Sequence, residues 1–303
     1  MNLLSPSKGI YIGTSGWSYA DWNGIVYPAK RPRGFVALSY LADLFDAVEI
    51  NASFYTPPSA RTAASWLEKV SGNPAFLFTA KLWRRFTHER DKAWSRSEEN
   101  RVRDGFHALQ EAGKLGAVLV QFPWSFEASP ANLNWLEAVG DAFRDYPLVV
   151  EVRHNSWLNE ERLNRLGKLG LGFCNIDQPH SAKGVGHANL ATGPIAYYRF
   201  HGRNREAWFD RDAGRDERYD YLYSEDELEP WARDIETMAN DANRIFVMSN
   251  NHYRGQAAVN ALQLKARLAG TRVPAPESLV SAYPVLQSIV APTPGQMRLD
   301  FDA

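Results

Sequence analysis

Eight short apolar segments alternate with helical patterns along this chain, which predicts an α/β fold, a (β/α)8 TIM-type barrel. The eight units occupy roughly 250 residues, the usual size of such a barrel. Polar side chains gather at the C-terminal ends of the apolar segments, whereas the segments begin apolar. Barrels of this kind carry their active sites at that end, so the polarity predicts a functional site there. A doubly wound open sheet is the competing fold.

The predicted strands are short runs rich in apolar and β-branched residues. They lie at 10–14, 46–51, 75–81, 117–122, 147–153, 171–177, 195–204 and 244–249. Apolar residues at helical spacing predict the helices between them, at 35–45, 59–70, 97–115, 130–143, 162–169, 224–240 and 255–268. Residues 206–223 have no clear period and are predicted to form a long loop over one end of the domain.

The chain is predicted to form a single domain, residues 1–270, with a C-terminal extension, residues 271–303. The extension opens with Val273-Pro274-Ala275-Pro276, and Ala291-Pro292-Thr293-Pro294-Gly295 follows later. Proline at this density is typical of a linker. The residues between the two proline stretches are expected to pack on the barrel.

The amino-acid composition indicates which classes of protein the chain can belong to. Hydrophobic residues make up 45% of the 303, enough for a sizeable core, and ten tryptophans suggest stacking surfaces or a deep pocket. The net charge of -1 argues against strong non-specific nucleic-acid binding through bulk charge. Cys174 is the single cysteine and excludes an intrachain disulfide. No signal peptide or 18-residue apolar run is present, so we expect a cytoplasmic protein with no membrane partner.

The stretch 195–204, IAYYRFHGRN, carries the most polar strand end. Side chains alternate along a strand, so Arg199 and His201 are predicted to point the same way. By the same rule Glu49 lies on one face with Asn51. A carboxylate inside a barrel needs a partner or a wet cavity. These strand ends therefore predict either chemistry or a network of paired charges.

Carboxylates and a histidine at strand ends are candidates for moving protons, and we assign the catalytic role to Glu49, Glu151, Asp177 and His201. Cations, amides and a tyrosine near them are predicted to bind substrate: Asn51, Tyr55, Lys81, His88, Gln121, Arg153, Arg199, Arg203, Asn250 and Asn251. The cations favour a phosphate or carboxylate group, so the expected partner is an anionic small molecule or nucleic acid.

Two alternatives stay open for the same residues. In the first, the charges are structural, with Glu49 paired to Lys81, and Glu151 paired to Arg153 or Arg199. In the second, Glu49, Glu151, Asp177 and His201 hold a divalent metal. The nearby cations oppose a metal and no His-x-His spacing is present, so no metal site is assigned. The glycines form no Walker or dinucleotide fingerprint, and no cofactor is predicted.

Seven stretches in order from about residue 10 to about 265 resemble the YecE-like family, a domain-of-unknown-function family numbered seventy-two. They read IGTSGWSYADWNGIVYP, VEINASFYTPPS, FTAKLWRRFTHER, LGAVLVQFPWSF, VVEVRHNSW, YYRFHGR and SNNHYRGQAAVNA. The resemblance implies a TIM-type barrel and no established reaction. The chain departs from the family pattern at Ser249, where an aromatic residue before the paired asparagines is more usual.

The end of the chain, Gln296 to Phe301, has the form Gln-x-x-Leu-x-Phe. It resembles the short peptide by which bacterial replication and repair proteins bind the sliding clamp, with Gln296, Leu299 and Phe301 as its anchors. Two hypotheses follow. The first is a barrel enzyme that acts on a phosphate-bearing or other anionic substrate by acid–base chemistry. The second is a nucleic-acid-associated repair accessory that the tail recruits to the clamp.

Overall fold

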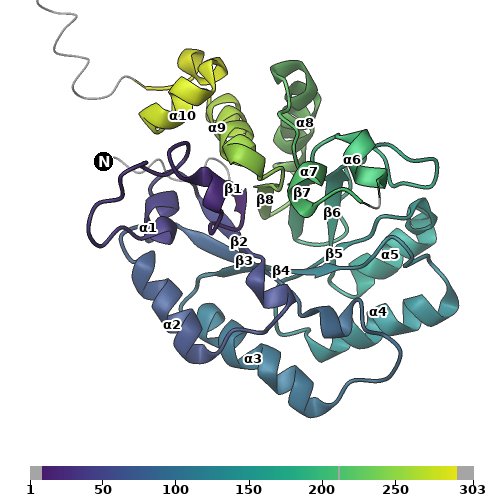
Figure 1. Ribbon diagram of the computed structural model, residues 1–303. Helices are drawn as coiled ribbons and strands as arrows, with labels where there is room; N and C mark the ends of the chain where they lie inside the picture. Colours follow the sequence, from purple (N-terminus) through teal and green to yellow (C-terminus); the bar gives the residue numbers. More distant parts are fainter. Residues whose placement is uncertain (1–8, 211, 292–303) are drawn as a thin grey trace, which may run out of the picture.

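The computed structural model describes residues 9–210 and 212–291, and its eight parallel strands close into a barrel in chain order (Figure 1). β1 pairs with both β2 and β8, which closes the sheet and leaves no edge. The predicted (β/α)8 TIM-type barrel is confirmed. The strands are β1 Ile10–Ser15, β2 Ala47–Ile50, β3 Leu77–Lys81, β4 Leu115–Gln121, β5 Leu148–Glu151, β6 Gly172–Asp177, β7 Ile195–Phe200 and β8 Arg244–Ser249.

Helices surround the barrel, as expected for parallel strands whose connections must cross back over the sheet. Serine side chains cap the N-termini of several of them, because a serine oxygen accepts a bond from a free backbone N–H of the first turn. The helices are α1 Ala37–Ala42, α2 Ala60–Lys69, α3 Arg96–Glu111, α4 Pro130–Ala142, α5 Glu160–Lys168, α6 Arg205–Phe209, α7 Arg215–Arg218, α8 Glu225–Met238, α9 Gln256–Ala269 and α10 Glu277–Ala282.

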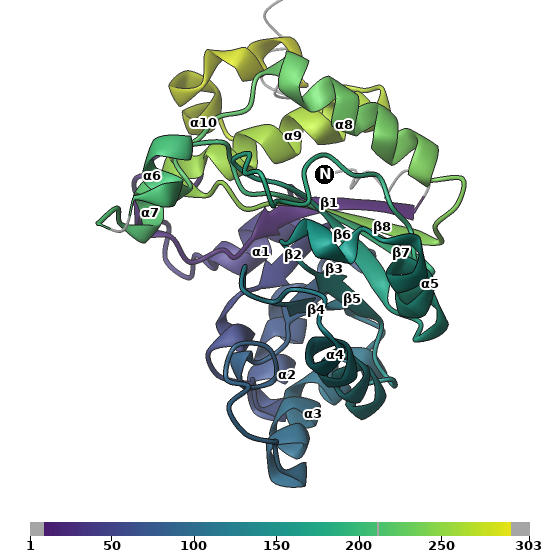
Figure 2. The same ribbon diagram turned by 90° about the vertical axis from the view of Figure 1, so that its right-hand side faces the viewer.

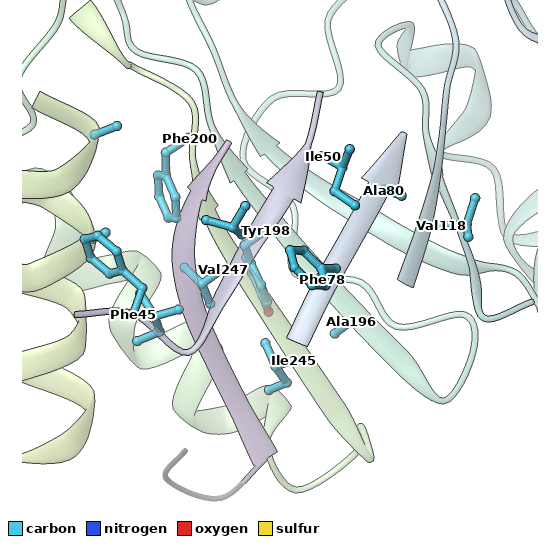
Figure 3. Close-up of a cluster of buried hydrophobic side chains, with 14 of the residues drawn as sticks. Phe45, Ile50, Phe78, Ala80, Val118, Ala196, Tyr198, Phe200, Ile245 and Val247 are labelled. Carbon is cyan, nitrogen blue, oxygen red and sulfur yellow. The ribbon is translucent and has the colours of Figure 1, made fainter. Parts of the chain in front are cut away.

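Alternation along each strand divides the core into two clusters. Outward-facing residues such as Phe78, Tyr198 and Val247 pack between the sheet and the helices (Figure 3). Inward-facing residues such as Tyr197 and Met248 fill the barrel itself. The inner cluster is apolar toward the beginnings of the strands. The charged inward-facing side chains Glu49, Glu151 and Arg199 come from the last residues of their strands, toward the barrel mouth.

The segment 206–223 contains short helices, where a loop without structure was expected. α6 and α7 lie together at one end of the barrel (Figure 2). They contain five and four residues, too few to show a 3.6-residue period in the sequence. The Asn204 side chain accepts from Ala207 N and begins α6, which is a capping signal that a period search misses.

Residues 271–291 pack closely against the rest of the chain. Val273, Leu279 and Leu286 are fully buried, and Val273 forms a bridge with Val290. The expectation of a linker at 273–276 is therefore wrong, because proline content does not report whether neighbouring apolar side chains find a surface. The segment between the two proline stretches includes α10 and a 3-10 turn at Pro284–Ser288.

Within the described residues, no helix combines the length and the apolar character that crossing a bilayer requires.

Candidate functional site

A cavity of about 430 Å³ opens at the ends of the strands. It lies where the sequence pattern predicts a functional site. Backbone, aromatic, amide and cationic groups share its wall, and the lining residues are Gly16, Trp17, Ser18, Tyr19, Asn51, Ala52, Tyr55, Lys81, Gln121, Arg199, Tyr219, Asn250 and His252.

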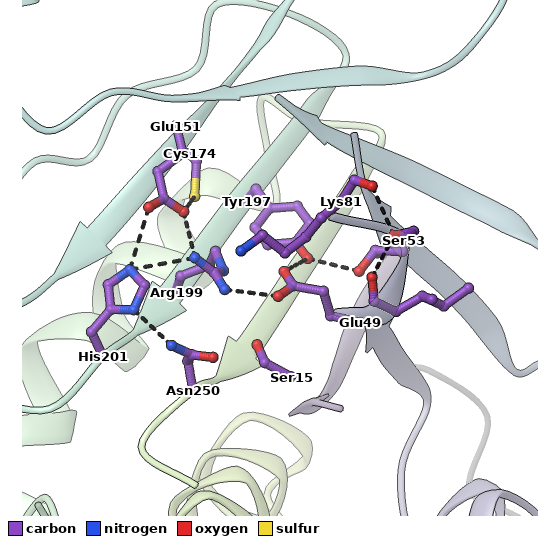
Figure 4. Close-up of polar contacts among 12 residues, drawn as sticks. Ser15, Glu49, Ser53, Lys81, Glu151, Cys174, Tyr197, Arg199, His201 and Asn250 are labelled. Atoms are coloured by element: carbon purple, nitrogen blue, oxygen red, sulfur yellow. Dashed lines mark hydrogen bonds and ion pairs between the residues drawn. The ribbon is translucent and has the colours of Figure 1, made fainter. Parts of the chain in front are cut away.

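Arg199 joins two carboxylates on the floor of this cavity (Figure 4). Its Nη2 donates to Glu49 Oε1 at 2.7 Å and its Nη1 donates to Glu151 Oε2 at 2.6 Å. All three side chains are buried. Burial opposes the charge on Arg199, yet the charges of Glu151 and Glu49 raise its pKa well above the usual range. The guanidinium is therefore permanently charged and held in one orientation.

Glu49 has a second donor deeper in the barrel. Tyr197 donates its hydroxyl proton to Glu49 Oε2 at 2.8 Å, and Thr79 Oγ1 lies 2.7 Å from the same Tyr197 oxygen. Because Tyr197 gives its one proton to Glu49, Thr79 is the donor in the second bond. Burial first, and Glu49 second, raise the pKa of Tyr197 well above its usual range. Both oxygens of Glu49 are thus occupied.

Glu151 is equally well satisfied. Arg153 donates to Glu151 Oε1 from Nε at 3.1 Å and from Nη2 at 2.9 Å. Burial favours the neutral acid, but the charges of Arg199 and Arg153 outweigh it and hold the pKa of Glu151 well below its usual range. Glu151 is therefore held in its anionic form.

His201 is neutral in this environment. Asn250 Nδ2 donates to His201 Nδ1 at 2.9 Å, and His201 Nε2 lies 3.5 Å from Glu151 Oε1. This arrangement assigns the proton to Nε2, where it faces the carboxylate. Burial, and then the charge of Arg199, lower the pKa of His201 to about 3. His201 thus supports Glu151 without adding a charge.

Lys81 ends β3 and reaches the cavity wall. Ser53 Oγ lies 2.7 Å from the backbone oxygens of both Ile50 and Lys81, which ties the turn after β2 to the end of β3. That turn places the Phe54 ring 4.4 Å from Lys81 Nζ. No ion pair of Lys81 is found among residues 9–210 and 212–291. Burial, and then the charge of Arg199, lower the pKa of Lys81 to about 8.

The charges around the cavity floor do not cancel. Among the described side chains that meet at the floor, Lys81, Arg153 and Arg199 are cations and Glu49 and Glu151 are anions, so this group of five carries one surplus positive charge. Both carboxylates bind Arg199, and Glu151 also binds Arg153. The surplus therefore rests on Lys81. The predicted pairing of Glu151 with Arg153 and Arg199 is present, whereas Glu49 pairs with Arg199 and not with Lys81.

The structure brings ten of the predicted site residues to this mouth. Asn51, Tyr55, Lys81, Gln121, Arg199 and Asn250 line the cavity. Glu49, Glu151, Arg153 and His201 form the network with Arg199.

Four predicted residues lie elsewhere. Asp177 follows the outward-facing alternation of β6 and accepts from Arg203 Nε at 2.9 and 3.1 Å, beside a second cavity of about 370 Å³. Asn251 donates to Tyr221 O and to Asn260 Oδ1, on the side of α9. His88 packs edge-on against Phe54, where burial and the charge of Lys81 lower its pKa to about 4.

Tyr19 and Tyr219 line the cavity wall and were not predicted as site residues. Tyr19 stacks on His252 with ring centroids 4.5 Å apart, and Tyr219 lies on the same histidine at 5.2 Å. Tyr19 comes four residues after the end of β1, and this position just beyond a strand end could have indicated it from the sequence. Tyr219 follows α7 in the segment without a period, so nothing in the sequence indicated it.

The remaining predictions concern a metal site and the tail motif. No group of three or more His, Cys, Asp and Glu side chains that could hold a metal ion is found in the part of the chain that the structure describes. Asp177, one of the four residues considered for such a site, is bound to Arg203. The tail residues Gln296, Leu299 and Phe301 lie outside the described residues, and their role stays a prediction.

Comparisons with known proteins agree with the barrel. The family model "Protein of unknown function DUF72" matches residues 11–281. The UPF0759 protein YunF of Bacillus subtilis is 31% identical over 269 residues, which cover 84% of this chain and 93% of YunF.

Solved structures are similar over the same region. A DUF72 family protein from Thermotoga maritima is 36% identical with a TM-score of 0.75, covering 86% of this chain and 99% of that one. One from Enterococcus faecalis is 26% identical with a TM-score of 0.76, covering 86% and 95%. The resemblance found in the seven sequence stretches is thereby confirmed. The chain belongs to the DUF72 family, a family of proteins of unknown function.

Proposed function

We propose that the protein is an enzyme that acts on an anionic substrate, foremost a phosphate-bearing one, by acid–base chemistry in the mouth cavity. The surplus positive charge at Lys81 is the observation that carries this proposal. An anion beside Lys81 would neutralise the surplus positive charge of the cavity floor. Electrostatic attraction is strong in such a place because the cavity walls exclude much of the water.

Lys81 is the group that we assign to proton transfer. A general acid or base is most effective when its pKa lies near the working pH, and the pKa of Lys81 is lowered to about 8. The carboxylates and the histidine chosen from the sequence already have partners. Glu49 accepts from Arg199 and Tyr197, Glu151 accepts from Arg199 and Arg153, and His201 accepts from Asn250. We therefore give them a positioning role, in which they fix Arg199 and Asn250 at the cavity floor.

The remaining wall suits the uncharged part of a substrate. Trp17, Tyr19, Tyr55 and Tyr219 offer aromatic surface, while the amides of Asn51, Gln121 and Asn250 can donate and accept hydrogen bonds. Cavities of this kind use apolar walls for affinity and a few polar groups for orientation. A substrate that combines an anionic group with a planar or apolar part would use both.

An activity screen tests the proposal. Wild-type protein and Lys81→Met are incubated with phosphate monoesters, phosphodiesters and sugar phosphates, and turnover is followed by phosphate release and by mass spectrometry of the products. We expect turnover of at least one class, with a loss of about 10²-fold or more in Lys81→Met. Lys69→Met, an exposed lysine of α2, is the matched control. Turnover that survives in Lys81→Met would overturn the assignment.

The Gln-x-x-Leu-x-Phe tail supports the alternative function, a repair accessory recruited to the sliding clamp. A peptide of residues 292–303 and a bacterial sliding clamp test this directly by fluorescence anisotropy. We expect saturable binding that is lost when Leu299 and Phe301 are both changed to Ala. Equal binding of the double variant would contradict the motif.

A further inference from the structure

Lys81 differs from other lysines of the chain in what its amine faces. Lys265 is buried and donates to Asp46 Oδ1 and to Leu44 O, each at 2.9 Å. Lys114 donates to three backbone oxygens. Lys81 Nζ faces the Phe54 ring, and no hydrogen-bond acceptor for it is found within the described ranges. An amine without an acceptor, on the wall of a cavity, is free to react.

The surroundings increase the fraction of the amine that is neutral and therefore nucleophilic. Burial and the neighbouring Arg199 act against the ammonium, while Glu49 and Glu151 are already bound to arginines. With a pKa of about 8, roughly a tenth of the amine is neutral at pH 7, against fewer than about one in a thousand for an ordinary lysine. Lysines activated in this way form imines with carbonyl compounds.

We propose that Lys81 forms an imine with the carbonyl carbon of an anionic aldehyde or ketone bound in the mouth cavity. This inference rests on the proposed function and narrows its substrate class to anionic carbonyl compounds. The Nζ lone pair forms a bond to the carbonyl carbon, and the amine loses its two protons as the carbonyl oxygen leaves as water. The resulting imine takes up one proton from solvent.

The protonated imine keeps the charge pattern that attracts the substrate. Its nitrogen carries the same single positive charge as the ammonium, so the surplus at the cavity floor is unchanged. Arg199 stays fixed by Glu49 and Glu151 throughout, because neither carboxylate takes part in the reaction. The amides of Gln121 and Asn250 on the wall are available to hydrogen-bond the departing oxygen.

Reductive trapping tests the inference. The full-length protein is incubated at pH 7 with glyoxylate, a small anionic aldehyde, and sodium cyanoborohydride. Peptide mass spectrometry then gives the rate of carboxymethylation at each lysine. We expect Lys81 to be labelled about tenfold faster or more than the exposed Lys69, and Lys265 to stay unlabelled. Inorganic phosphate should slow labelling at Lys81 and leave Lys69 unchanged.

Controls separate this inference from the proposed function. Lys81→Arg keeps the charge and removes the primary amine, so it should bind phosphate in a calorimetric titration and yield no adduct at position 81. Phosphate binding together with labelling of Lys81 no faster than Lys69 would overturn the imine and leave the anion site standing. A different result would be fast labelling of Lys81 that phosphate does not slow, together with no phosphate binding in the titration. That result would support the imine and overturn the anionic part of the proposed function.

Discussion

Arg199 is the residue on which the polar floor of the barrel depends. Its guanidinium joins Glu49 and Glu151, and all three side chains are buried. Taking such charges out of water has a high free-energy cost, which their attraction repays only when each has its partners. A buried network of this kind is weak support for stability, and better support for a fixed geometry at the cavity.

Removing Arg199 should therefore be strongly destabilising. Arg199→Met leaves two buried carboxylates facing each other without their shared partner, and we expect a loss of about 3–5 kcal/mol in the free energy of unfolding. Urea denaturation followed by circular dichroism measures it. The surface variant Arg233→Met, which breaks an exposed pair with Glu229, should lose at most about 1 kcal/mol. Equal losses for the two variants would contradict the role given to Arg199.

His201 should make the fold sensitive to acid. Its pKa is lowered to about 3 in the folded protein, so between pH 6.5 and 3 the unfolded chain binds more protons than the folded one. Its contribution is therefore fully present above pH 6.5 and is lost as pH falls through that window. We expect the unfolding free energy of the wild type to fall more steeply there than that of His201→Asn. If the unfolding free energies of the two proteins changed in parallel with pH, the lowered pKa of His201 would be contradicted.

The strands are the elements that the sequence defined best. All eight were predicted, because short apolar runs bounded by polar residues occur at regular intervals. Alternation also placed Arg199 with His201 and Glu151 with Arg153. Asp177 was assigned from its place at the end of β6 alone, whereas the alternation of β6 turns it outward, away from the mouth cavity. Tyr219 and the short helices α6 and α7 have too few residues for a period to form.

The β1–β2 contact offers a test at the level of the element. A Cβ on Gly13 would lie 1.7 Å from the backbone oxygen of Ala47, so β1 and β2 approach closely only with glycine there. We expect Gly13→Ala to lower the midpoint of thermal unfolding sharply, by the equivalent of more than about 3 kcal/mol. Gly72→Ala is the matched control, since a Cβ there meets nothing within 4 Å. Tolerance of Gly13→Ala would mean that the strands are further apart.

The interior of the barrel has an apolar region and a polar cavity. Apolar side chains such as Leu119 and Phe246 fill the apolar region, and charged and amide groups line the cavity at the mouth. The family and the fold could be predicted from the sequence, because both depend on patterns that extend along the chain. The surplus charge at Lys81 could not be predicted, because it depends on which carboxylate forms an ion pair with which cation in the folded structure. The sequence suggested Glu49 with Lys81, whereas Glu49 binds Arg199.

A calorimetric titration with inorganic phosphate tests the surplus charge most directly. We predict binding at a single site, with affinity about tenfold lower or worse in Lys81→Met, equivalent to about 1.4 kcal/mol, and unchanged in Lys69→Met. Because Lys81 carries its charge below its pKa of about 8, the affinity of the wild type should fall as pH rises through that value. Absence of binding, or equal affinity in wild type and Lys81→Met, would contradict an anion site at the barrel mouth.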